Sequence, residues 1–222
     1  LVLVHGLNGD LVDSWTFNEG NISTCWPRDL LPKVLPRTRV LSLGYNGDIY
    51  FNDSTAGIRG NAESLLAQLR IRRPDSSRPI VLLGHCLGGL IVKQASGSRL
   101  LFGTPHFGTD KNHWLSIANG LALMKGILGN EPSALVKAIT KNSRDLAEIS
   151  EDFCQIAPQY TIKSFYETLP WRDTNEQIVD KMSSLILIDS EIAEAVDADH
   201  LAMCKFADED DPTFLSVCAS IE

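Results

Sequence analysis

Residues 80–92 read IVLLGHCLGGLIV. A short apolar run ends in a glycine-rich turn, and a second apolar run follows at once. The first run, 80–83, has the length and branched residues of a buried strand, whereas the second run suits a short helix. A strand, a sharp turn and a helix form the context in which the pattern Gly-x-nucleophile-x-Gly carries chemistry. This pattern places Cys86 at the nucleophile position.

The glycines of this turn have a physical reason. Because so tight a turn folds the helix back against the strands, side chains at positions 84 and 88 would clash there. The central residue then projects at the start of the helix, where the helix dipole favours a developing anion. We expect the N–H group of Leu87 to point at a bound oxyanion. A phosphate-binding turn is the weaker interpretation, since the lysine and hydroxyl residue of a P-loop are absent.

Cys86 occupies a position at which serine is usual for this pattern. One interpretation is a natural thiol nucleophile, which is intrinsically more reactive than a hydroxyl. A second is an engineered replacement of serine, made to trap or slow an acyl intermediate. A third is a small structural residue in an inactive enzyme.

The start of the sequence, LVLVHGLNGD, supplies a second element of the same site. Residues 1–4 predict a short buried strand, and His5 and Gly6 open a glycine-rich turn after it. Such a turn provides the other oxyanion-hole donor in this context, so we assign that role to the N–H of Leu7. His5 and His85, which flank the two turns, are expected to lie at the pocket.

The order nucleophile, acid, histidine fixes the search for the other catalytic groups. His200, in the sequence DADH after the last candidate strand, is the predicted general base. His106, in GTPHFG at the end of another strand, is expected to line the pocket. Glu167, at the end of the predicted strand 161–166, is the first choice of acid. Asp180 is the alternative, and Asp173 ranks third.

Apolar strand-like runs alternate with helical patterns along the whole chain. Strands are predicted at 1–4, 38–43, 80–83, 100–103, 161–166 and 178–188, and helices at 28–35, 57–71, after 86, and as two short helices over 200–220. This alternation indicates an α/β fold with a mostly parallel sheet flanked by helices, formed by residues 1–222 as a single domain. Sites in such sheets lie at the carboxyl ends of the strands.

The stretch 107–157 is too long for a simple connection and has helical periodicity. We expect it to form a helical cap beside the turn at Cys86. Such a cap would favour an apolar acyl substrate. The alternative is that these apolar residues merely cover the sheet.

Composition limits the remaining classes of function. With 44% hydrophobic residues among 222, the chain can bury a core, and its net charge of −8 disfavours nucleic acid and anionic membranes as partners. The most apolar stretch is shorter than the roughly 20 residues of a transmembrane helix. Five cysteines without metal-like spacing indicate mostly free thiols and no metal site. We therefore expect an intracellular location, in the reducing cytoplasm.

Motifs spread over nearly the whole chain resemble those of the α/β-hydrolase superfamily. They are HGLNGD, WPRDLLPKVLP, GHCLGGLIVKQA, FGTPHFGT, SFYET and ADHLAMCKF. Within that superfamily the chain is similar to an intracellular lipase-like group, which includes serine-active-site-containing proteins and the N-terminal hydrolase domains of fungal NACHT or repeat receptors. The resemblance implies an α/β-hydrolase fold and a triad without cofactor. Because that group has serine at the turn, Cys86 is a departure from it.

The leading hypothesis is hydrolysis of a small-molecule ester or thioester through a covalent acyl-enzyme. An acyltransferase or cyclising thioesterase would use the same residues, with an alcohol or amine in place of water. An effector domain of a larger signalling receptor and a non-catalytic binding domain are the other classes. The abrupt junction at 94–99 also suggests that a loop is missing from this sequence.

Overall fold

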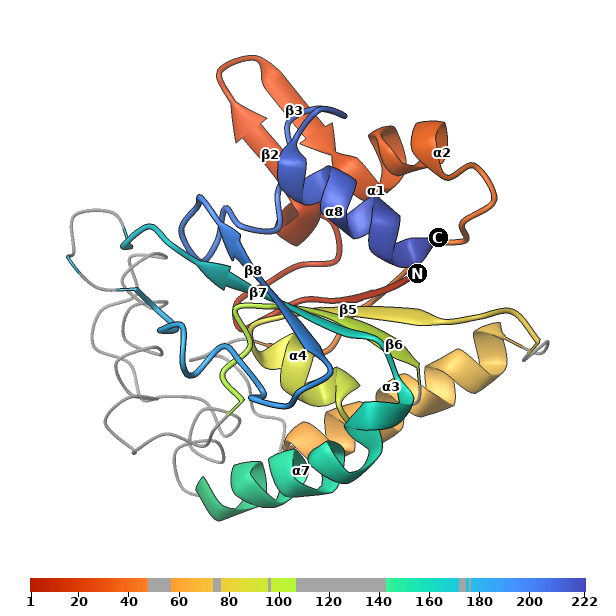
Figure 1. Cartoon of the computed structure of the whole chain (residues 1–222). Helices are drawn as coiled ribbons and strands as arrows, with labels where there is room; N and C mark the ends of the chain where they lie inside the picture. Colours follow the sequence, from red (N-terminus) through yellow and green to blue (C-terminus); the bar gives the residue numbers. More distant parts are fainter. Residues whose placement is uncertain (48–56, 74–76, 96, 107–142, 172–174, 176) are drawn as a thin grey trace.

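The computed structural model describes residues 1–47, 57–73, 77–95, 97–106, 143–171, 175 and 177–222. Its centre is a six-stranded sheet with the strand order β4-β1-β5-β6-β7-β8 (Figure 1). All neighbouring strands in it are parallel. The strands are β1 (Val2–Val4), β4 (Leu41–Leu43), β5 (Val81–His85), β6 (Ser98–Phe102), β7 (Ile162–Glu167) and β8 (Glu191–Val196). The predicted α/β fold is confirmed.

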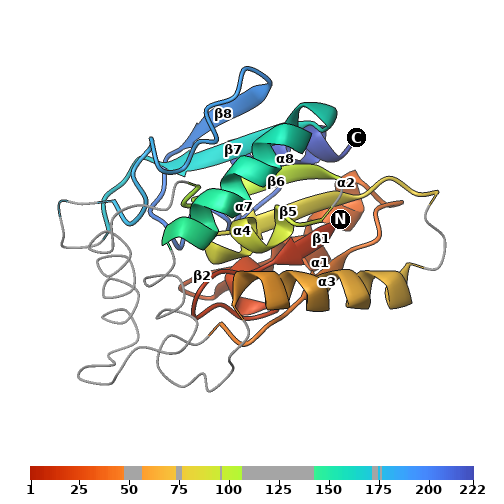
Figure 2. The ribbon, with the colours of Figure 1, turned by 90° about the horizontal axis from the view of Figure 1, so that it is seen from below.

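Helices cover both faces of the sheet (Figures 1 and 2). One face carries α3 (Ile58–Arg72), α4 (Leu87–Val92) and α7 (Ser143–Ile156), and the other carries α1 (Trp26–Asp29), α2 (Leu31–Val34) and α8 (Pro212–Ile221). Successive side chains of a strand point to opposite faces, so Val2 and Val4 pack in one apolar cluster and Leu3 in the other. Burial on both faces explains why β1 and the first part of β5 are apolar at successive positions rather than alternating.

The helix α7 overlaps the last part of the predicted cap. Its residues Ile149 and Phe153 are buried in the same apolar cluster as the core of α3 and α4. Figure 2 shows α7 running across the sheet beside α4. This part of 107–157 therefore covers the sheet, and residues 107–142 lie outside the described part of the chain.

The predicted strand at 178–188 is wrong, because the last strand of the sheet is β8. The main-chain N–H groups of Ile186 and Leu187 donate to the carboxylate of Glu191 rather than to a neighbouring strand. Leu187 also has a φ of 64°, which ends extended structure there. Residues 178–188 are a loop between β7 and β8.

The remaining elements differ from the sequence-based predictions. The hairpin of β2 (Thr16–Glu19) and β3 (Ile22–Cys25) was not predicted, nor were the short 3-10 helices at Asp13–Trp15 and Ala157–Gln159. One helix, α8, replaces the two predicted at the end of the chain, and Asp211 caps it by accepting from the N–H groups of Thr213 and Phe214. No helix among the described residues is both long and apolar enough to span a membrane.

Candidate active site

Cys86 lies in the turn between β5 and α4, at the carboxyl edge of the sheet. Its backbone has φ 52° and ψ −121°, a conformation that L-residues other than glycine rarely adopt. Its N–H donates to the carbonyl of Phe102 on β6 at 2.8 Å, and its carbonyl accepts from the N–H of Gly89 at 3.1 Å. Strain held in place by neighbouring structure is typical of functional positions.

The glycines beside Cys86 allow α4 to pack directly on the strands. A Cβ at Gly84 would lie 2.6 Å from the main chain of Gly89, and one at Gly88 would lie 2.2 Å from the carbonyl oxygen of Val4. Both distances are far below van der Waals contact with backbone atoms, which have little freedom to move. The tight approach predicted from the sequence is thus present.

The turn after β1 lies against the nucleophile. A Cβ at Gly6 would lie only 2.7 Å from the Cβ of Cys86. The N–H of Gly9 donates to the carbonyl of Gly6 at 3.1 Å and closes the turn around Leu7. Leu87 is the first residue of α4, so its N–H has no acceptor within the helix. The two predicted oxyanion donors therefore belong to turns on either side of Cys86.

His200 and Glu167 form a fully buried pair. Nδ1 of His200 is 3.0 Å from Oε2 of Glu167, and neither side chain is exposed to solvent. Because a carboxylate only accepts, Nδ1 carries the hydrogen and donates it. The other carboxylate oxygen, Oε1, accepts from the N–H of Val179 at 2.7 Å. Glu167 is thereby fixed on both sides and orients the imidazole ring.

The remaining nitrogen of His200, Nε2, is buried and makes no well-aligned hydrogen bond within the described chain. Burial alone would lower the pKa of His200. Burial is the largest single effect, but the charge and sulfur of Cys86, added to the hydrogen bond and charge of Glu167, together exceed it and raise the pKa of His200 from 6.5 to about 10. Cys86, His200 and Glu167, which are far apart in the sequence, therefore meet in one electrostatic cluster.

This origin of the raised pKa makes a prediction for nuclear magnetic resonance. In the Cys86 protein, His200 should titrate near pH 10, and in Cys86→Ser its pKa should fall, because a hydroxyl does not ionise in this range. The raised pKa stabilises the fold fully below about pH 6.5, and this stabilisation is lost as the pH rises through about 10. An unchanged titration in Cys86→Ser would contradict the coupling of the two groups.

His85 and His5 lie beside this cluster. Nε2 of His85 donates to the main-chain carbonyl of His200 at 2.8 Å, and the two ring centroids are 4.8 Å apart. Burial, followed by the charge of His200, holds the pKa of His85 well below its usual value, so the ring is neutral. His5 stacks on Tyr45 at 4.7 Å with an interplanar angle of 5°. Burial also lowers the pKa of His5.

His106 follows β6 and is almost fully buried. Its N–H donates to the carbonyl of Ser183 at 2.8 Å, and its carbonyl accepts from the hydroxyl of Ser150 on α7. Nζ of Lys93 donates to that hydroxyl at 3.0 Å. Burial lowers the pKa of His106 well below its usual value and that of Lys93 to about 7. His106 is thus fixed within a buried network that joins α4 to α7.

The alternative acid, Asp180, lies elsewhere. Its carboxylate accepts from the N–H of Ser183 at 3.0 Å and from the hydroxyl of the same residue at 2.7 Å. The carboxylate at Nδ1 of His200 is that of Glu167. The third choice, Asp173, lies outside the described residues.

Tyr45 is a residue of this region that the sequence did not single out. It follows β4 by two positions, at the same edge of the sheet as His5 and Cys86. The sequence signal that could have indicated Tyr45 is its position just after the carboxyl end of a parallel strand, where binding residues are often found.

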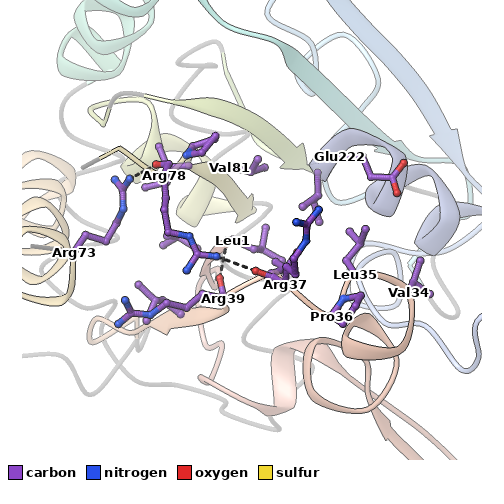
Figure 3. Close-up of a pocket in the computed structure, with 16 residues that line it drawn as sticks. Leu1, Val34, Leu35, Pro36, Arg37, Arg39, Arg73, Arg78, Val81 and Glu222 are labelled. Carbon is purple, nitrogen blue, oxygen red and sulfur yellow. Dashed lines mark hydrogen bonds between the residues drawn. The ribbon is translucent and has the colours of Figure 1, made fainter. Parts of the chain in front are cut away.

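Metal-ligating side chains and cavities are the other features that bear on ligand binding. Among the described residues, no group of three His, Cys, Asp or Glu side chains could hold a metal ion. A cavity of about 920 Å³ lies at the amino ends of β1 and β5, opposite the edge that holds Cys86 (Figure 3). Four arginines contribute to its wall: Arg37, Arg39, Arg73 and Arg78.

Residues 1–213 match the sequence profile of the alpha/beta hydrolase family. The chain belongs to this family. Two solved structures share the fold of this α/β-hydrolase. The mature lipase BlEst2 of Bacillus licheniformis superposes with a TM-score of 0.62 at 16% identity, over 98% of this chain and 90% of the lipase. Phospholipase PlaB from Legionella pneumophila superposes with a TM-score of 0.55 at 16% identity, over 82% of this chain and 41% of the phospholipase.

Similar curated sequences are those of protein SERAC1. The Danio rerio protein is 24% identical over 97% of this chain, and the Homo sapiens protein is 26% identical over 92%. The matched regions cover 37% and 36% of those proteins, so this α/β-hydrolase spans little more than a third of their length.

Proposed function

We propose that this α/β-hydrolase cleaves carboxylic esters or thioesters through a covalent intermediate on Cys86. The observation that supports this most strongly is the buried Glu167–His200 pair, whose free nitrogen belongs to the same electrostatic cluster as Cys86. The names of the superposed lipase and phospholipase agree with ester chemistry. A third solved structure, that of a carboxylesterase of Nitrososphaera gargenis, superposes on this chain with a TM-score of 0.55 at 10% identity.

In the proposed first step, the thiol proton of Cys86 passes to Nε2 of His200, or already lies there in a thiolate–imidazolium pair, and the sulfur attacks the acyl carbon. The N–H groups of Leu7 and Leu87 hold the oxyanion. The bond to the leaving alcohol or thiol then breaks, and the leaving group takes the proton from Nε2. The products of this half-reaction are a thioester on Cys86 and the free alcohol or thiol.

In the second step, His200 takes a proton from water, and the resulting hydroxide equivalent attacks the thioester carbon. The carbon–sulfur bond breaks, the thiol of Cys86 recovers its proton, and a carboxylic acid leaves. Glu167 remains ionised throughout and stabilises the imidazolium. An alcohol or amine in place of water would give acyl transfer with the same residues, so the acceptor is decided by measurement.

The test is intact-mass spectrometry with p-nitrophenyl acetate, butyrate and octanoate, with release of nitrophenolate followed in parallel. We expect one acyl group per chain, or turnover, in the parent protein and neither in Cys86→Ala. Cys154→Ala is the matched control, because Cys154 is the one cysteine that is not fully buried and is the thiol most open to accidental acylation. Equal acylation of the parent and Cys86→Ala would refute the proposal.

Cys86→Ser decides what the thiol is for. If the serine variant turns over quickly while the parent accumulates a stable adduct, the cysteine slows deacylation in an ordinary serine-type site. If the serine variant is slower, the site is built for a thiol, and thioesters become the preferred substrate class.

A further inference from the structure

A buried hydroxyl near Cys86 has no described partner. Oη of Tyr45 is screened from solvent, although the residue as a whole is only partly buried, and it makes no hydrogen bond within the described chain. An unpaired buried hydroxyl destabilises the fold, because it has lost its hydrogen bonds to water without replacement. Such a group calls for an explanation, and a ligand that pairs with it is one.

The loop that holds Tyr45 is attached to the turn that holds Leu7. The N–H of Asn8 donates to the carbonyl of Gly47 at 2.9 Å. A Cβ at Gly47 would lie 3.1 Å from the carbonyl oxygen of Gly6 and 3.4 Å from the ring of Tyr45. The phenol ring therefore lies beside the predicted oxyanion turn, in a loop that a main-chain hydrogen bond holds to that turn.

The stacked ring of His5 connects Tyr45 to the nucleophile. Val4 is paired with Leu43, so the residues after β1 and β4 leave the sheet side by side. His5 supports the flat face of the phenol, and the next residue, Gly6, touches Cys86. Two consecutive residues, His5 and Gly6, thus provide the support of the phenol and the contact with the nucleophile.

We propose that the hydroxyl of Tyr45 is a third hydrogen-bond donor to the carbonyl oxygen of the substrate, beside the N–H groups of Leu7 and Leu87. This inference rests on the proposed acylation of Cys86. A phenol in this place strengthens its bond as negative charge grows on the carbonyl oxygen, which is the condition for lowering a barrier.

The charge state of Tyr45 agrees with a donor. Burial raises the pKa of Tyr45 well above its usual value, and the charge of Cys86 raises it further. The phenol therefore keeps its hydrogen throughout the neutral pH range. His5, the ring stacked on it, is neutral there as well, because burial lowers its pKa.

The experiment compares two reactions of the same thiol in Tyr45→Phe and in the parent protein. Acylation by p-nitrophenyl butyrate builds an oxyanion, whereas alkylation of Cys86 by iodoacetamide does not. We expect acylation in Tyr45→Phe to be slower by about 10²-fold, the effect of losing one oxyanion donor. We expect the alkylation rate to remain within about twofold. Both rates are measured by intact mass.

Tyr160→Phe is the matched control, since this tyrosine packs on Arg99, with 4.9 Å from guanidinium to ring centroid, at the amino end of β7. It should change neither rate. The melting temperature of Tyr45→Phe should be unchanged or higher, because an unpaired hydroxyl is removed.

The outcomes separate the two proposals. If the parent protein is alkylated but not acylated, the proposed function fails and the role of Tyr45 fails with it. If the parent is acylated and Tyr45→Phe is acylated equally fast, the function stands and the third donor is refuted. Equal loss of both reactions, or a variant that does not fold, would assign Tyr45 a structural role and also refute the donor.

Discussion

Replacing Glu167 with glutamine is expected to slow the acylation of Cys86 by a factor on the order of 10³, while the protein stays folded. The carboxylate accepts two hydrogen bonds, one from Val179 and one from His200. Glutamine has one accepting oxygen and one donating nitrogen at these two positions. If the amide oxygen keeps the bond to the N–H of Val179, the amide nitrogen faces Nδ1 of His200.

That exchange reverses the tautomer of the histidine. A donor opposite Nδ1 forces this nitrogen to accept, so the ring hydrogen moves to Nε2. Nε2 then faces Cys86 as a donor and has no lone pair with which to take the thiol proton. The variant also loses the contribution of Glu167 to the raised pKa of His200. The pKa of His200 therefore falls below about 10, and the imidazolium loses its proton at a lower pH than in the parent protein.

The measurement is the second-order rate of acylation by a p-nitrophenyl ester, together with the nitrogen chemical shifts of His200. Asp180→Asn is the matched control, since it makes the same chemical change on a carboxylate that binds Ser183. Its rate should stay within about threefold of the parent. A Glu167→Gln rate that is equally close to the parent would show that Glu167 is not the triad acid.

The sequence predicted most of the sheet because parallel strands buried on both faces are apolar at every position. The strands at the start and before Cys86 could be found by this signal. The edge strand β8 could not. Its sequence EIAEAV is rich in helix-forming residues, and most of its side chains are partly or fully exposed. The more apolar segment 178–188 therefore gives the stronger strand signal, although it forms a loop.

Two sequence signals made part of the candidate site predictable. They are the Gly-x-nucleophile-x-Gly turn and the order nucleophile, acid, histidine along the chain. Cys86 and Glu167 lie at strand ends and His200 lies in the loop after β8, and the fold brings the carboxyl ends of these strands to one edge. Tyr45 could not be found in this way, because its place depends on a ring stack with His5 and on a loop contact at Gly47. Neither contact has a sequence pattern, whereas the hairpin of β2 and β3 offered only the weak signal of Gly20 in a short loop.

The second large effect concerns stability. Gly88→Ala is expected to destabilise the fold by about 4 kcal/mol or more, which is a large share of the 5–15 kcal/mol that holds a typical domain together. The new Cβ would lie 2.2 Å from the carbonyl oxygen of Val4 and 2.5 Å from that of His5. Both oxygens are main-chain atoms at the carboxyl end of β1, which is paired with a strand on either side. No rotamer change can therefore relieve the clash.

The relief that remains is a shift of α4 away from β1, and this shift would also damage the site. Leu87 begins α4 and Cys86 precedes it, so the nucleophile and one oxyanion donor would move together. We expect a melting temperature lower by on the order of 10 °C, measured by circular dichroism, or insoluble expression. Gly57→Ala is the control, because a Cβ there meets no atom of the described residues within 4 Å, and its effect should stay under about 1 kcal/mol. Equal stability of the two variants would show that α4 does not pack as closely on β1 as its glycines require.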